Sequence, residues 1–454
     1  MKTDLSIAPI ASEPRSFHFP EFERFHLANG LEILLLQQSD FPLINISLCI
    51  KSSALADPAG EEGTANFLSE LLSEGTTNRT SSRIAEELEF IAANFSAYTD
   101  WHAIHMEMNA LSQHLDKAFE IFSDMLLQPV FPEAELKRIK RELLTERIRV
   151  VDNPARLNAE QFIRSLYPKV RYGMPVEGGE KTIKKIERSG IVDFYDEYFT
   201  PANATLIFAG DIDRETAKKI SQKYLSSWKS KSKPMYSKPQ VSQPDKTVIH
   251  LTHKPGSAQT ELRMGHLGIE RKNPDYYAVT LLNEILGGYF LSRINMNLRE
   301  EHGYTYGANS SFSYRPGLGP FHVTASIQSE HTAAAVQEVI KEISTIRQEL
   351  VKEEELKNAR GQIVGLFPIA FETTAQVAMG LSNIILAELP DDYYNTFRNR
   401  ISQVTRENIL QAAQKYLHPE KLQIALTGDR DIIEQDLRKH FDVRVYDVKG
   451  NSID

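Results

Sequence analysis

The most constraining feature of this chain of 454 residues is a sequence pattern that occurs twice. Five residues near the end of the first half recur in the second half at a constant offset (416 − 198 = 218), namely Tyr198/Tyr416, Pro201/Pro419, Gly210/Gly428, Asp211/Asp429 and Asp213/Asp431. Further upstream, Glu135-Leu-Lys137 matches Glu355-Leu-Lys357 at an offset of 220. A single repetition of a unit of about 210–220 residues predicts two homologous domains, not a solenoid of many short repeats.

The boundary between the two units falls in a segment rich in Ser, Lys and Pro. Residues 228–244 show no apolar periodicity, which is typical of an extended linker. We therefore expect a first unit at 15–230, a linker at 231–245 and a second unit at 246–454.

Each unit mixes strand and helix patterns. Two β-rich runs, Leu31–Gln37 and Leu43–Lys51, flank Ser39–Pro42, which predicts a hairpin. Apolar residues at helical spacing and short apolar runs predict helices at Ser81–Ala92, Leu115–Leu127, Tyr276–Leu286 and Ala333–Leu350, and late strands at Thr205–Ala209 and Leu422–Thr427. Each late strand leads through a Gly-Asp turn into a final helix, with Asp213 or Asp431 as its expected cap. The predicted fold class is α+β, with helices backing a largely antiparallel sheet in each of two tandem units.

Composition limits the classes of partner and the compartment that we expect for this chain. The net charge of −9 argues against nucleic acid as a partner, because phosphate binding relies on clustered Lys and Arg. The single cysteine, Cys49, lies in an apolar run and is expected to be a core residue. The N-terminal residues do not resemble a signal peptide, and no apolar run approaches the roughly 18 residues that span a bilayer. We expect a cytoplasmic protein that does not bind a membrane.

The segment from Gly60 to Thr76 carries the most specific motif of the first unit. It reads G-E-E-G-T-A-N-F-L-S-E-L-L-S-E-G-T and resembles the signature helix of the insulinase/pitrilysin family, G-x-A-H-F-L-E-H-x-x-x-x-G-T. In that family two His at i and i+4 bind zinc, the Glu before the second His is the general base, and a Glu about 77 residues further on completes the site. The frame is present here at Gly63, Ala65, Phe67, Leu68, Gly75 and Thr76.

The metal ligands implied by the resemblance are all replaced. Asn66 and Glu70 stand where the two His would be, and Ser69 stands where the base would be. Arg147 occupies the position of the distant Glu (70 + 77 = 147), and Glu146 could replace it only in a register that still lacks imidazole partners. We therefore predict that this chain binds no metal and has no cofactor of its own.

Other histidines do not restore a site. The pairs His102/His105 and His250/His253 are spaced three apart in strand-like segments, so their members face opposite sides. If the helices pack as in the family, Glu70 and Arg147 would meet where zinc would lie and could form an ion pair; the alternative is that both are solvated helix charges.

The second unit retains the other family signature. The run from Leu286 to Gly307 contains L-G-G-Y-F-L-S-R and L-R-E-E-H-G-Y-T-Y, which is similar to the family's L-G-G-G-x-x-S-R-L-x-x-x-L-R-E-x-x-G-x-x-Y. The resemblance implies that Arg299 and Tyr306 contact a substrate carbonyl and stabilise the oxyanion at a zinc site (306 − 299 = 7). The structural alternative is a helix-ending Arg and a half-buried sheet Tyr. Gly303 between them is expected to break the helix.

A third segment, Asn94–Ala103, is similar to the family's S/N-A-x-T strand. The resemblance implies that Ala97, Tyr98 and Thr99 pair with an extended peptide by adding a strand to the sheet edge. Without a zinc ion nearby, the same strand could be purely structural.

Together these features resemble the non-catalytic subunit of family heterodimers, such as the alpha subunit of mitochondrial processing peptidase and bacterial relatives. The resemblance implies a chain that forms half of a clamshell and has no peptidase activity alone. It would supply substrate contacts to a homologous partner with an intact H-x-x-E-H helix and bound zinc, which cleaves unfolded or extended peptides. Two alternatives remain open: a structural scaffold, as in family members of respiratory complexes, and a homodimeric peptide-binding pseudo-enzyme.

Overall fold

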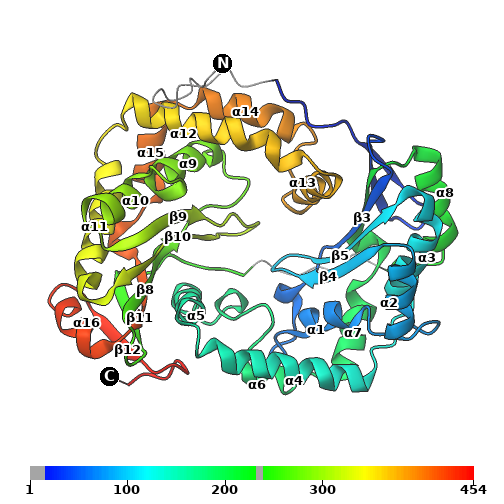
Figure 1. The fold of residues 1–454 in the computed structure, drawn as a ribbon, viewed down its shortest axis with the longest axis horizontal. Helices are drawn as coiled ribbons and strands as arrows, with labels where there is room; N and C mark the ends of the chain where they lie inside the picture. Colours follow the sequence, from blue (N-terminus) through cyan, green and yellow to red (C-terminus); the bar gives the residue numbers. More distant parts are fainter. Residues whose placement is uncertain (1–15, 232–238, 454) are drawn as a thin grey trace, which may run out of the picture.

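The chain folds into two similar halves, each built on a six-stranded sheet (Figure 1). The computed structural model describes residues 16–231 and 239–453. Of the predicted linker, residues 232–238 lie outside the described residues. The predicted α+β architecture is confirmed.

The first sheet has the order β1-β2-β6-β3-β5-β4. All its neighbouring pairs are antiparallel except β2 and β6. Its strands are β1 (Glu23–His26), β2 (Glu32–Gln37), β3 (Leu43–Ile50), β4 (Asn94–Thr99), β5 (Ile104–Leu111) and β6 (Ala204–Gly210). The α-helices of this half are α1 (Thr64–Leu71), α2 (Ser81–Phe90), α3 (Leu115–Leu127), α4 (Glu133–Val150), α5 (Pro154–Leu166), α6 (Glu180–Ile183), α7 (Arg188–Tyr198) and α8 (Arg214–Leu225).

The second sheet has the order β12-β7-β11-β8-β10-β9, with β7 parallel to both β12 and β11. Its strands are β7 (Val248–His253), β8 (Gln259–Leu267), β9 (Thr305–Phe312), β10 (Pro320–Gln328), β11 (Gln423–Gly428) and β12 (Val443–Tyr446). The α-helices of this half are α9 (Tyr276–Asn283), α10 (Arg293–Asn295), α11 (Thr332–Ile346), α12 (Glu353–Leu366), α13 (Thr374–Leu386), α14 (Tyr393–Gln403), α15 (Arg406–Tyr416) and α16 (Arg430–Leu437). The repeat offset of 220 reappears in α4 and α12, which begin at Glu133 and Glu353.

Two local predictions are wrong. β2 and β3 do not form a hairpin, because β6 lies between them and pairs with both. The backbone N–H of Gln38 and that of Asp211 bond to Gly210 and Leu43, so residues near Ser39–Pro42 cross over an inserted strand. At α16 the cap is Asp429, whose carboxylate accepts from the N–H of Asp431, whereas Asp213 caps α8 as expected.

The two halves exchange equivalent helices. α13 of the second half packs on β3 and β6 of the first sheet, and α5 of the first half packs on β8 and β11 of the second (Figure 1). Alternate residues of β2 and β6 therefore face different cores: Leu35 and Phe208 face the helices of their own half, whereas Leu36 and Ala209 contact α13. This two-sided burial explains why β6 is apolar and buried along its whole length.

A polar clamp holds α5 in place. The amide Nδ2 of buried Asn158 donates to the carbonyl oxygens of Glu261 and Ala425, at 3.0 and 2.8 Å. Within the described residues, no single helix is long and apolar enough to cross a membrane. One pair, Glu353–Phe371 and Thr374–Leu386, passes that test jointly but is bent by 110°.

Candidate functional site

The helix that carries the degenerate zinc motif, α1, begins at a tightly constrained turn. Gly63 has φ +113°, and a Cβ there would lie 2.5 Å from the carbonyl oxygen of Glu177. The buried carboxylate of Asp57 accepts hydrogen bonds from the N–H groups of Gly63 and Ala65, both at 2.8 Å, and pairs with Arg171 at 2.8 Å. Burial raises the pKa of Asp57, and Arg171 opposes that shift. The turn and helix of the motif are thus formed as in the family frame. Asp57 was not predicted from the sequence because it lies before the motif.

The residue at the position of the general base, Ser69, is part of the packing between α1 and β4. Ser69 is buried, and its hydroxyl donates to the carbonyl of Asn66 at 2.8 Å. The hydroxyl of Thr99 on β4 lies 3.0 Å from the carbonyl oxygen of Ala65 and 3.1 Å from Oγ of Ser69. These contacts fix the end of β4 on α1, and the neutral hydroxyl of Ser69 cannot take a proton from water as a carboxylate does.

The predicted ion pair between Glu70 and Arg147 is wrong. Arg147 instead forms a two-pronged pair with Glu160 of α5, with Nη1–Oε1 at 2.5 Å and Nη2–Oε2 at 2.6 Å. This pairing raises the pKa of Arg147. The physical reason is that α5 returns past α4 after a short turn and offers Arg147 a nearer carboxylate, a tertiary contact that the spacing of 77 residues does not report.

Glu70 lies in a different charge cluster. The pKa of Glu70 lies above its usual value, mainly because partial burial raises it. The carboxylates of Glu142 and Glu74 add to this rise, and Arg138 opposes it. Arg138 in turn pairs with Glu74 at 2.7 Å, with Glu142 at 2.8 Å and with Glu135 at 2.6 Å. The guanidinium of Arg138 thus pairs with carboxylates near Glu70, the residue at the position of the second zinc ligand.

These residues do not fit a zinc ion. The four ligand and base positions hold Asn66, Ser69, Glu70 and Arg147, and the last is a cation already engaged with a carboxylate. Over residues 16–231 and 239–453, no group of three or more His, Cys, Asp or Glu side chains is arranged to hold a metal ion. Zinc requires deprotonated N, S or O ligands in a tetrahedral set, which this arrangement does not offer.

The Arg/Tyr segment of the second half is outward-facing. Arg299 lies in a π-helical turn (Met296–Glu301), Gly303 follows with φ +67°, and Tyr306 is the second residue of β9. Tyr306 is 89% exposed, and its phenol makes no hydrogen bond to any described residue. Because β9 is the edge strand of its sheet, this phenol is available to an external molecule.

Arg299 is oriented by its neighbours. Its guanidinium lies 4.5 Å from the ring centroid of Phe290, which is itself 60% exposed, and 3.4 Å from the carboxylate of Glu300. Leu291 beside it is also exposed. Arg299 and Phe290 lie together beside exposed Leu291, and β9, which carries Tyr306, packs against the turn that carries Arg299. These four residues are here called the 290–306 patch.

The predicted substrate-binding strand, β4, is an edge strand of the first sheet. Its side chains alternate in exposure, as expected for an edge strand with one solvated face. Tyr98 donates to Glu107 at 2.9 Å and stacks on His105 with ring centroids 4.6 Å apart, while Ala97 and Thr99 face inward. Among the described strands, none pairs with the outer backbone edge of β4, so a peptide strand can add to it.

A buried polar network links β3, β5 and α13. Cys49 is a core residue as predicted; its Sγ lies 3.6 Å from Nδ1 of His105 and 3.4 Å from Oγ of Ser382. Nε2 of His105 lies 3.0 Å from Asp100. Burial acts to lower the pKa of His105, but the bonds to Asp100 and Cys49 raise it to about 10. The sequence signal for this network was the cross-strand register of Cys49 and His105, which requires knowing that β3 pairs with β5.

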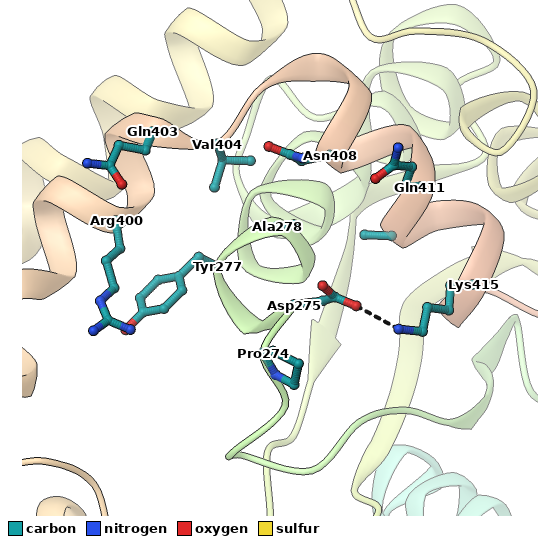
Figure 2. Close-up of a pocket in the computed structure, with 11 residues that line it drawn as sticks. Pro274, Asp275, Tyr277, Ala278, Arg400, Gln403, Val404, Asn408, Gln411 and Lys415 are labelled. Atoms are coloured by element: carbon teal, nitrogen blue, oxygen red, sulfur yellow. Dashed lines mark hydrogen bonds and ion pairs between the residues drawn. The ribbon is translucent and has the colours of Figure 1, made fainter.

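A separate groove of about 630 Å³ lies between α9, α14 and α15 (Figure 2). Its polar contacts are satisfied locally: Lys415 pairs with Asp275 at 2.9 Å, and Arg400 lies over the ring of Tyr277 at 5.5 Å. None of the residues singled out from the sequence lines this groove.

Two tandem sheet-and-helix halves with a degenerate metal helix in the first define a metallopeptidase-like chain. Residues 33–178 match the family description "Insulinase (Peptidase family M16)", and residues 185–363 match "Peptidase M16 inactive domain". An uncharacterized zinc protease of Rickettsia bellii is 30% identical over 351 residues, covering 77% of this chain and 84% of that protein. This chain belongs to the insulinase family of peptidases, family M16.

More distant matches are to members of the same family. The beta subunit of the mitochondrial-processing peptidase of Saccharomyces cerevisiae is 20% identical over 92% of this chain and 93% of its own length. The crystal structure of a peptidase M16 inactive domain from Pseudomonas fluorescens matches with a TM-score of 0.85 and 25% identity, covering 90% of this chain and 98% of that one.

Proposed function

We propose that this chain is the subunit without zinc of a two-subunit metalloendopeptidase. It contributes substrate contacts, and a homologous chain with an intact H-x-x-E-H helix supplies the zinc. The observation that carries the proposal is the contrast between two motifs. The first keeps its frame but none of the ligands, whereas the second keeps an exposed Tyr306 and a partly exposed Arg299.

The surface chemistry supports a role in trans. Tyr306 is exposed and Arg299 is partly exposed, and a phenol and a guanidinium suit a peptide carbonyl that becomes an oxyanion when water attacks. The free edge of β4 offers backbone groups to an extended peptide. Such a peptide would lie along Ala97, Tyr98 and Thr99 on one side of the complex.

The test is co-purification of the chain from its native host, followed by zinc analysis and a peptide-cleavage assay. We expect a homologous zinc-bearing partner and an active complex, and neither stoichiometric zinc nor cleavage for the isolated chain. Stoichiometric zinc with activity in the isolated chain would refute the proposal. A chain that purifies alone or as a homodimer without activity would favour the pseudo-enzyme or scaffold alternatives.

The in-trans role is tested separately in the active complex. Arg299→Ala and Tyr306→Phe should each reduce kcat by about 10²-fold, the scale of removing one oxyanion donor. Arg149→Ala, which removes an exposed guanidinium from α4, is the matched control and should leave kcat unchanged. Full activity in both Arg299→Ala and Tyr306→Phe would show that these residues do not act on the substrate.

A further inference from the structure

A cavity of about 450 Å³ lies at the seam between the two halves. The turn between β4 and β5 and the turn between β9 and β10 meet there, and α13 and α14 close it (Figure 1). Both halves contribute polar side chains: Asp100 and His102 come from the first, and Arg271, Arg315 and Asn383 come from the second. None of these residues belongs to the zinc-motif helix or to the 290–306 patch.

Arg315 is a mostly buried cation that forms no ion pair with a carboxylate of the described residues. Its guanidinium carbon lies 4.4 Å from the ring centroid of Tyr172, 5.3 Å from that of Trp101 and 5.4 Å from that of Tyr167. Its Nη1 is buried and has no hydrogen-bond acceptor among the described residues. Burial lowers the pKa of Arg315, since aromatic faces replace only part of the lost hydration of a guanidinium.

Arg271 is the second cation of the cavity. It lies 3.9 Å from the ring centroid of Tyr276 and 4.7 Å from that of Tyr393, and its Nη2 donates to the Tyr393 hydroxyl at 2.5 Å. Within the described part of the chain, neither Arg271 nor Arg315 forms an ion pair with a carboxylate. Two guanidinium groups held by aromatic rings thus line one cavity.

The one carboxylate in the lining is already compensated. Asp100 accepts from the N–H groups of His102 and Ala103, at 2.6 and 2.8 Å, and pairs with His105 at 3.0 Å. These contacts lower the pKa of Asp100 against the effect of burial. Because His105 pairs with Asp100, this carboxylate, which also acts on Arg315 electrostatically, offsets the charge of the two arginines only in part.

We infer that this seam cavity binds an anionic group, a carboxylate or a phosphate, between Arg271 and Arg315. An anion would pair with the two incompletely solvated guanidinium groups, whose planar forks match both oxyanion types. The tyrosine rings would accept an apolar or aromatic body attached to that group. A volume of about 450 Å³ suits a small organic acid or the acidic end of a peptide. This inference does not depend on the proposed function.

Isothermal titration of the full chain with three probes tests the site: N-acetylphenylalanine, its uncharged amide, and inorganic phosphate. We expect the acid, phosphate or both to bind, with the amide at least about 10-fold weaker, the scale of losing a charge-assisted hydrogen bond. Binding of the acid alone assigns a carboxylate ligand, and binding of phosphate assigns a phosphate. Failure of both anions to bind, or equal binding of the amide, would overturn the inference.

Three variants locate the binding. Arg271→Gln and Arg315→Gln should each weaken the anion by about 10-fold or more. Arg400→Gln is the matched control, because Arg400 also lies over a tyrosine ring but lines the outer groove of Figure 2. Thermal melting establishes that each variant folds; if Arg315→Gln does not, Arg271→Gln decides the result. Unchanged affinity in the folded arginine variants would show that the anion binds elsewhere.

Discussion

The pairing of Arg147 with Glu160 can be measured by a double-mutant cycle. Both side chains are mostly buried, with 15% and 16% of their surface exposed, and the two parallel N–H···O bonds join α4 to α5. We expect Arg147→Met and Glu160→Gln each to lower the free energy of unfolding by about 1–3 kcal/mol, less than for a fully buried pair. The coupling energy between the two changes should be about 1–3 kcal/mol. Each single change already removes the ion pair, so the second change costs less in the double variant than alone.

The assay is urea denaturation followed by tryptophan fluorescence. Trp101 lies at the seam and Trp228 is buried in the first core, so the two report on different parts of the fold. The matched control is the cycle of Arg147→Met with Glu70→Gln, for which the coupling should be near zero. A coupling below about 0.5 kcal/mol for Glu160, or an equal coupling for Glu70, would refute the arrangement described here.

Two further predictions concern buried polar groups. Since the pKa of His105 is raised from 6.5 in the unfolded chain to about 10, its stabilisation is complete below pH 6.5 and is lost as the pH rises toward 10. His105→Gln should therefore lower the free energy of unfolding most near pH 6, by up to about 5 kcal/mol, and least near pH 10. A difference that does not change with pH would contradict this. Asn158→Ala should lower the free energy of unfolding by about 1–3 kcal/mol in urea denaturation, because two buried hydrogen bonds between α5 and the second sheet are lost. Asn94→Ala on the exposed edge strand should change the same quantity by less than about 0.5 kcal/mol, and equal losses would contradict the clamp.

The sequence predicted the elements whose causes are local. The helix at Leu115–Leu127 was predicted to the residue, and Asp213 was predicted to cap α8, since apolar spacing and capping act within a few residues. The repeat offset predicted two halves because equivalent segments fold equivalently. These signals also identified the motif frame around Gly63.

The errors concern features that apolar spacing and local composition do not report. The insertion of β6 between β2 and β3 joins residues about 170 positions apart, so the run around Ser39–Pro42 has the local composition of a hairpin without forming one. Glu160 as the partner of Arg147 and the seam cavity around Arg315 likewise depend on how helices and turns pack. At α16 the cap is Asp429 and not Asp431 because the helix starts two residues earlier than predicted.

The reciprocal placement of α5 and α13 limits how this molecule can move. Swinging the two halves apart would draw Asn158 away from its carbonyl partners and strip Leu381 and its apolar neighbours from the first sheet. A hinge motion is easy only where few buried contacts must break, and separating these two halves would break many. We therefore expect the two halves to move together, because separating them would break the buried contacts of both helices.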